Sequence, residues 1–145
     1  MKEISVNLKS IISSSLPQLR KINDEIASIK KTPDQWSKKE ILGHLIDSCS
    51  NNHQRIVRAL YNVADQFPIY DQNEWVRVQN YNEMGWDYLI KFWAAYNNHL
   101  SIIIERIPDS ARSAACNIGK EESVTLEFVL TDYIRHLHHH LDQLV

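Results

Sequence analysis

The apolar residues of this chain recur at intervals of three and four over most of its length, which is the period of α-helices facing a hydrophobic core. The first such segment runs from Ile4 to Ile29 and is interrupted by Pro17. Because proline lacks a backbone donor, we expect either a kink there or a new helix capped by Ser14 or Ser15. With only three glycines and four prolines in 145 residues, long uninterrupted helices are favoured.

Similar spacing continues through three further segments, so the sequence predicts an all-α four-helix bundle with almost no strand. The expected helices, with ends uncertain by a few residues, are 5–31, 38–64, 86–107 and 125–144. Ser37 and Glu40 have the spacing of a capping box before the second helix, and Thr125 suits the N-cap of the fourth. We expect a single domain spanning residues 1–145.

A long loop of residues 66–82 joins the second and third predicted helices. It is neither periodic nor disordered in composition, and its large apolar or aromatic side chains are Phe67, Ile69, Tyr70, Trp75 and Tyr81. Such side chains need cover from water. We therefore expect the segment from Phe67 to Tyr81 to be ordered and to pack near an open end of the bundle.

Composition excludes several classes of function. A net charge of −2 gives no basic footprint for nucleic acid, and the doublets Lys30–Lys31 and Lys38–Lys39 read as solvated surface. No apolar run approaches the roughly 18 residues that span a bilayer, and no signal peptide is evident. We expect Cys49 and Cys116 to be free thiols in a reducing cytoplasm. Surface segments rich in Trp and Tyr are compatible with a homodimer, although no interface is defined.

Histidine placement is the strongest chemical signal in the sequence. Four of the seven histidines lie near the end of the chain, where His136 and His140 are four residues apart and would share one helix face. His44 lies in an apolar segment of the second predicted helix. Three imidazoles would leave a first-row metal ion an open position, as catalytic sites do. Solvated histidines are the competing interpretation, because such pairs also arise by chance.

A polar stripe runs along the second predicted helix beside its apolar one. It begins at His44 and continues through Asp47, Asn51 and Arg55. This stripe is either the solvent-facing side of the helix or the lining of a pocket. In the second case these side chains would lie around the metal ion or contact the substrate.

Three stretches together resemble the DinB-like superfamily. They are Trp36–Ser48 with Asn51–Arg55, Pro68–Asp71 with Trp75, and Asp132–His140 with Gln143. The resemblance covers nearly the whole chain in the expected order. It implies a four-helix bundle that binds one divalent metal ion, usually zinc or nickel. Matched by position, the ligands would be His44, His136 and His140, whereas the histidines outside the motif are His53, His99, His138 and His139.

The superfamily includes bacillithiol S-transferases and mycothiol-dependent isomerases, so the resemblance leaves the reaction open. Our leading hypothesis is a metal-dependent transferase that joins a low-molecular-weight thiol to a small electrophile, because a metal-bound thiol loses its proton. Asp47 would orient an imidazole or the substrate, and Asn51 and Arg55 would hold a substrate carboxylate. No catalytic residue is assigned. The alternatives are a metal-dependent hydrolase and a non-catalytic, metal-stabilised binding or stress-response protein.

Overall fold

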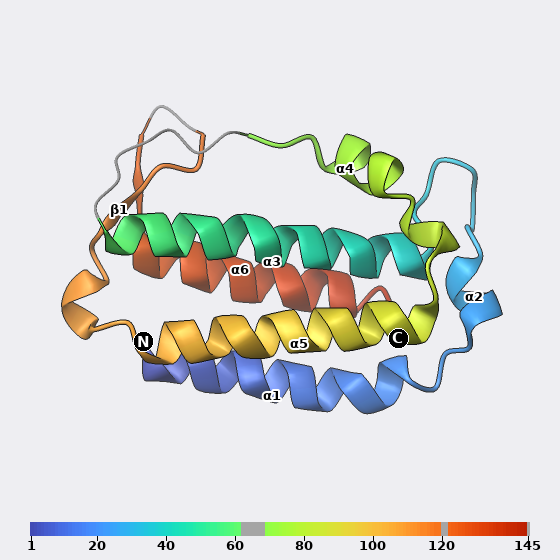
Figure 1. The fold of residues 1–145 in the computed structure, drawn as a ribbon, viewed down its shortest axis with the longest axis horizontal. Coiled ribbons are helices and arrows are strands. Elements are labelled where there is room, and N and C mark those ends of the chain that lie inside the picture. The colour runs from blue at the N-terminus through green and yellow to red at the C-terminus, as the bar shows by residue number, and fades with distance from the viewer. Residues whose placement is uncertain (62–68, 120–121, 145) are drawn as a thin grey trace.

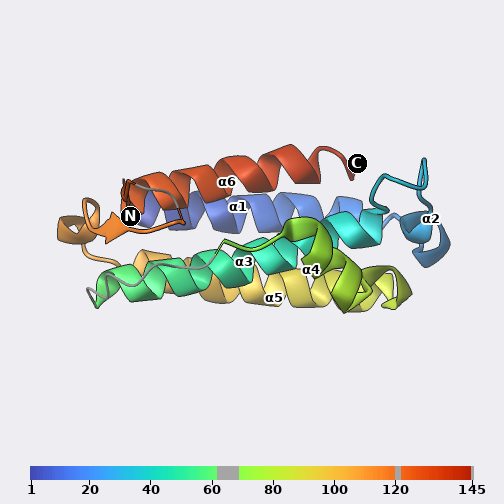
Figure 2. The same ribbon diagram turned by 90° about the horizontal axis from the view of Figure 1, so that it is seen from above.

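The computed structural model describes residues 1–61, 69–119 and 122–144. Four long helices lie side by side along the molecule (Figures 1 and 2). They are α1 (Lys2–Leu19), α3 (Lys38–Leu60), α5 (Trp86–Glu105) and α6 (Leu126–Leu141). Shorter elements connect them: α2 (Asp24–Ser28), α4 (Gln72–Gln79), the 3-10 turns η1 (Tyr81–Glu83) and η2 (Asp109–Ala111), and strands β1 (Ala115–Cys116) and β2 (Val124–Thr125). The predicted all-α four-helix bundle is confirmed.

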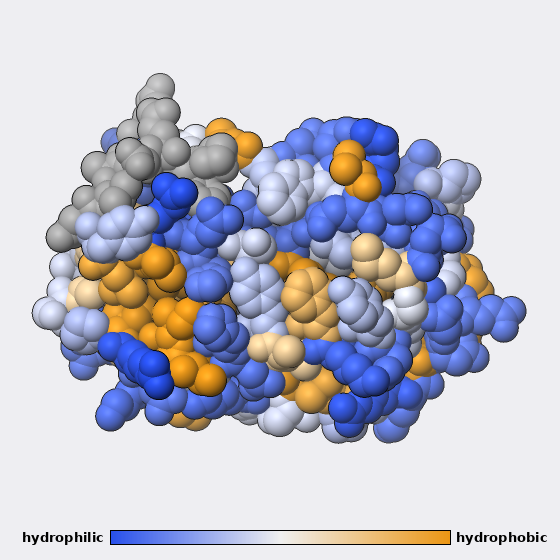
Figure 3. Space-filling model, in the orientation of Figure 1, coloured by the Kyte–Doolittle hydropathy of each residue, from blue (hydrophilic) through white to orange (hydrophobic). Residues whose placement is uncertain are grey.

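Each long helix packs against two others, in the cyclic order α1, α5, α3, α6. The shared core is made of large side chains with almost no exposed surface, among them Leu8, Leu42, Leu45, Leu89, Trp93, Leu100, Leu130 and Leu137. Burying one such side chain stabilises the fold by about 1.5–3 kcal/mol. Some apolar surface remains on the face of the bundle that Figure 3 shows. Two apolar side chains of α5, Phe92 and Ile102, are nearly half exposed. None of the helices that the structure describes combines the length and the apolar character needed to cross a membrane.

The capping box predicted at the start of α3 is confirmed. The Glu40 backbone N–H donates to Ser37 Oγ over 3.2 Å, and Glu40 Oε2 accepts from the Ser37 backbone N–H over 2.8 Å. At the start of α6, Thr125 Oγ1 accepts from the Phe128 backbone N–H, also as predicted. These caps satisfy donors that helix ends otherwise leave without partners, and so fix where each helix begins.

The first predicted helix, 5–31, is two helices in the structure. α1 ends at Leu19, and α2 starts afresh with Asn23 as its N-cap. The expected new start near Pro17 is wrong, because Pro17 lies inside the last turns of α1. Instead of capping, the hydroxyl of Ser14 donates to a carbonyl within its own helix. Pro17 has no N–H to donate to the carbonyl four residues before it, so α1 lacks one hydrogen bond there and ends two residues later.

The connection between α3 and α5 contains the unpredicted helix α4, which lies across α3 (Figure 2). Asp71 caps α4 by accepting from two backbone N–H groups. The expected burial holds for Tyr81, which is 3% exposed, and fails for Ile69, which is 76% exposed. Phe67 lies outside the described residues. The predicted starts of α3 and α5 are correct, and the end of α5 and both ends of α6 differ from those predicted by one to three residues. Helix α3 ends at Leu60 where residue 64 was expected, and residues 62–64 are not described.

Candidate metal centre

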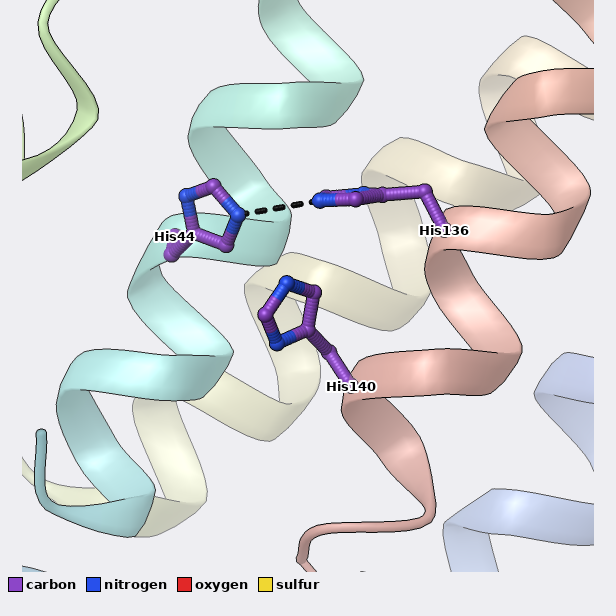
Figure 4. A group of neighbouring side chains, drawn as sticks. All are labelled: His44, His136 and His140. Atoms are coloured by element: carbon purple, nitrogen blue, oxygen red, sulfur yellow. Dashed lines mark hydrogen bonds between the residues drawn. The ribbon is translucent and has the colours of Figure 1, made fainter.

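Three histidines from two helices converge inside the bundle (Figure 4). His44 comes from α3, and His136 and His140 come from successive turns of α6. One ring nitrogen from each lies within 4.8 Å of the others, and the Nε2 atoms of His44 and His136 are 3.1 Å apart. Within the described chain, this is the one group of three or more histidine, cysteine or acidic side chains close enough to hold an ion. The structure therefore brings together the three residues that the sequence predicted.

The histidine trio is sheltered by its surroundings. His44 is 1% exposed, and the indole of Trp36 packs against its ring with centroids 5.0 Å apart. Within the trio the ring centroids lie 4.6–5.0 Å apart, with planes inclined by 72–75°. Edge-to-face rings at this separation can direct one nitrogen each toward a shared point.

The three imidazoles are neutral at physiological pH. Burial lowers the pKa of His44 to about 3, with further contributions from His136 and His140. Burial and the nearby His140 lower the pKa of His136 to about 4. The pKa of His140 is lowered too, by burial and then by His139. A neutral imidazole has a free lone pair, which is the form that binds a metal ion.

These side chains fit a first-row divalent ion such as zinc or nickel. The second nitrogen of His136, Nδ1, lies 3.3 Å from Ser48 Oγ, which can fix the ring orientation. The Nδ1 atoms of His44 and His140 are buried and have no hydrogen-bond partner in the described part of the protein. Two metal–nitrogen bonds of about 2.1 Å allow their nitrogens to be at most about 4.2 Å apart. The most widely separated nitrogens of the trio therefore have to approach each other slightly to bind one ion.

The polar stripe on α3 lines the interior and is not the solvent face. Asp47 is 3% exposed and Asn51 is 4% exposed. Asp47 Oδ1 accepts from the Tyr81 hydroxyl over 2.6 Å and from Gln79 Nε2 over 2.7 Å. Burial raises the pKa of Asp47, whereas these two hydrogen bonds lower it. Its other oxygen, Oδ2, is buried and accepts no hydrogen bond from the residues that the structure describes.

Asn51 and Arg55 lie one and two turns beyond Asp47 on α3. The Asn51 amide donates to the Asp47 backbone carbonyl over 2.9 Å, so it supports its own helix. Arg55 is partly buried, and burial lowers the pKa of its guanidinium. Their predicted contacts with a substrate stay predictions.

Sequence reasoning missed Tyr81 and Gln79, which hold Asp47, and the reason why position 43 is glycine. A Cβ atom at Gly43 would lie 2.2 Å from Cγ and from Cδ2 of the Tyr81 ring. The ring therefore packs directly on the helix backbone beside His44. The signal in the sequence was a glycine inside a helix, which costs stability unless close approach requires it.

The other histidines are not members of the trio, as the sequence motif implied. His138 and His139 are exposed on α6, and His139 Nε2 lies 3.1 Å from the Gln143 side-chain amide. His53 on α3 packs against His99 of α5, with ring centroids 5.4 Å apart. His139 is adjacent to His140 in sequence and contacts its ring, which makes it a matched control for metal binding.

Comparisons with known proteins agree with this architecture. YfiT from Bacillus subtilis, described as a probable metal-dependent hydrolase with an unusual four-helix bundle topology, has a TM-score of 0.85 at 18% identity. That alignment covers 98% of this chain and 82% of YfiT. A mycothiol-dependent maleylpyruvate isomerase has a TM-score of 0.78 at 15% identity, covering 98% of this chain and 59% of the isomerase. Such identities establish a shared fold alone.

The search of curated proteins gives no match. The sequence model of the DinB superfamily matches residues 12–144, a range that contains all three histidines of the trio. On the strength of that match, this chain belongs to the DinB superfamily.

Proposed function

We propose that this protein binds one divalent ion, zinc or nickel, through His44, His136 and His140, and uses it to activate a low-molecular-weight thiol against a small electrophile. The observation that carries this proposal is the convergence of three neutral, sheltered ring nitrogens. Three histidine ligands leave a coordination position for a substrate. A mycothiol-dependent enzyme with the same fold supports a thiol as the substrate class.

A bound ion would supply a positive charge that lowers the pKa of a coordinated thiol. The chain itself supplies orientation. The hydrogen bond between Ser48 Oγ and His136 Nδ1, 3.3 Å long, keeps the opposite nitrogen facing His44. Asp47, one turn from His44, presents a buried oxygen that accepts a hydrogen bond or a proton from the substrate. Tyr81 and Gln79 hold this carboxylate in place.

Metal-dependent hydrolysis is the second candidate, favoured by the same Asp47 oxygen. A buried carboxylate with a raised pKa suits a general base that removes a proton from water. The description of YfiT as a probable hydrolase points the same way. We rank it second, because the chain lacks the glutamate spacing of the HExxH metal proteases.

Metal content tests the ligand assignment directly. We expect untagged protein to hold one equivalent of zinc or nickel, and His140→Ala or His44→Ala to lose it together with the metal-dependent rise in melting temperature. His139→Ala is the matched control and should keep both, because its ring lies on the exposed side of α6. Equal metal loss in His139→Ala, or full retention in His44→Ala, would mean that the ligands are wrongly assigned.

Activity assays then separate the two reactions. With the metal-loaded protein, we expect consumption of 1-chloro-2,4-dinitrobenzene to require an added thiol and to disappear in His136→Ala. Asp47→Asn should lower the rate while leaving the metal bound, because the side chain is not one of the three ligands. Hydrolysis of a p-nitrophenyl ester without thiol, also lost in His136→Ala, would favour the hydrolase instead.

A further inference from the structure

A cavity of about 680 Å³ opens at the end of the bundle where the last turn of α6 meets the first turn of α3. Its walls come from the segment between α2 and α3, from the first residues of α3 and α4, and from the residues that follow α6. A volume of this size matches the sites of small organic ligands. All of its lining residues are described by the structure.

The cavity lies next to the histidine trio. Trp36 lines it and also packs against the ring of His44. Ile41 and Gln143 line it as well, and each lies three residues from a histidine of the trio on the same helix face or its continuation. The Trp36 indole therefore connects the cavity to the candidate metal ligands, with one face of the residue lining the cavity and a ring contact to His44.

The charges of the cavity lining are of both signs. Lys31 and Lys38 bring two ammonium groups, and Asp34 and Asp142 bring two carboxylates. Four side-chain amides add hydrogen-bond donors and acceptors: Gln35, Gln72, Asn73 and Gln143. The lining thus favours a polar molecule that itself carries both charges.

The two cavity lysines, Lys31 and Lys38, differ in their ion pairing from the lysines next to them in the sequence. Lys30 pairs with Glu40 over 2.8 Å, and Lys39 pairs with Asp24 over 2.9 Å. Lys31 and Lys38 form no ion pair with any described residue, and Lys38 donates instead to the Leu144 carbonyl. Lys31 and Lys38 line the same cavity, and the pKa of Lys38 is lowered by burial and then by the charge of Lys31. An anionic group placed between them would be attracted to both ammonium groups.

We propose that this cavity binds the zwitterionic body of a small ligand. Lys31 and Lys38 bind its carboxylate, Asp34 and Asp142 bind its ammonium group, and its reactive end passes Trp36 to reach the histidine trio. The inference rests on the proposed function only for what happens at that reactive end. The cavity and its charges do not depend on a bound ion.

The test uses S-methylglutathione, which has an ammonium group and two carboxylates but cannot form a metal thiolate. We expect calorimetric titration to detect its binding to both the metal-free and the zinc-loaded protein. Its diethyl ester, with both carboxylates masked, should bind about tenfold more weakly, the effect of one lost charge-assisted hydrogen bond. Failure of the metal site would leave these results unchanged, so the two proposals fail separately.

Substitutions identify the groups responsible. Lys31→Gln with Lys38→Gln should weaken binding of S-methylglutathione about tenfold or more and leave that of its ester unchanged. Lys31→Gln alone should show part of the loss, at an exposed position where folding is not at risk. Lys91→Gln removes the same charge from an exposed pair on α5 and should change nothing. No binding to the wild-type protein, or an equal loss in Lys91→Gln, would overturn the proposal.

Discussion

Replacing Gly43 with alanine tests how tightly the candidate site is built. The new Cβ would lie 2.2 Å from two atoms of the Tyr81 ring, far inside van der Waals contact. Tyr81 is 3% exposed, and its hydroxyl is one of two donors to the buried Asp47 carboxylate. The ring therefore has to move, and moving it withdraws a donor from Asp47.

The expected magnitude follows from three contributions. Alanine is favoured over glycine inside a helix by about 1 kcal/mol. Forcing a methyl group into a packed interior costs about 1–3 kcal/mol. Withdrawing the hydroxyl from a buried carboxylate costs about another 1–3 kcal/mol. The net loss of stability is therefore roughly 3 kcal/mol, equivalent to a fall in melting temperature of roughly 6–12 °C for a chain of this size.

Urea unfolding of the metal-free protein measures this loss. Gly85→Ala is the control, because a Cβ at Gly85 meets no atom within 4 Å. In a protein that already carries Tyr81→Ala, adding Gly43→Ala should cost little further stability, since the clashing ring is then gone. If Gly43→Ala alone raised stability by about 1 kcal/mol, as at an open helical position, the close packing of Tyr81 on α3 would be refuted.

Three further outcomes are expected. The pKa values of His44 and His136 in the folded protein are about 3 and about 4, against 6.5 for an ordinary histidine. Below pH 6.5 the unfolded chain therefore binds more protons than the folded protein does. The free energy of unfolding of the metal-free protein should therefore be highest above pH 6.5 and fall toward pH 4; urea titrations showing no such fall would contradict the burial of these rings. Burial raises the pKa of the Cys49 thiol to about 12 and also raises that of Cys116, so Ellman's reagent should react at pH 8 only after denaturant is added. Ser37→Ala should lower the free energy of unfolding by about 1 kcal/mol through loss of the α3 cap, and an unchanged urea midpoint would argue against that cap.

The sequence was most informative where local chemistry decides the structure. The spacing of apolar residues predicted the long helices, and Ser37 with Glu40 predicted the start of α3 within a residue. The break after α1 was missed, and of the two alternatives expected at Pro17 the new helix start is wrong, because Pro17 is a stronger local signal than Asn23, the common surface residue that caps α2. Helix α4 is only eight residues long and lies in a segment without sustained periodicity.

Some features of the candidate site could likewise be predicted from the sequence, and others could not. His136 and His140 could be paired by their spacing, and His44 was grouped with them because an imidazole in an apolar segment needs a partner. The resemblance to a family strengthened that grouping. The contact of Tyr81 with Gly43 and Asp47 crosses more than thirty residues, and no local pattern encodes it. The cavity lysines looked like solvated surface because part of the cavity wall, Asp142 and Gln143, comes from the far end of the chain.

The separation of the candidate ligands along the chain has a consequence for assembly. His136 and His140 are neighbours on one helix, but His44 is 92 residues away from His136. An ion held by all three would act as a reversible cross-link, and closing a loop of about 100 residues removes about 4.7 kcal/mol of chain entropy from the unfolded state. Two ligands can capture an ion while the chain is still open, whereas the third is available only after α3 has docked. Chelators should therefore act mainly by hastening the undocking of α3 from α6, with little effect on how fast the four helices first come together.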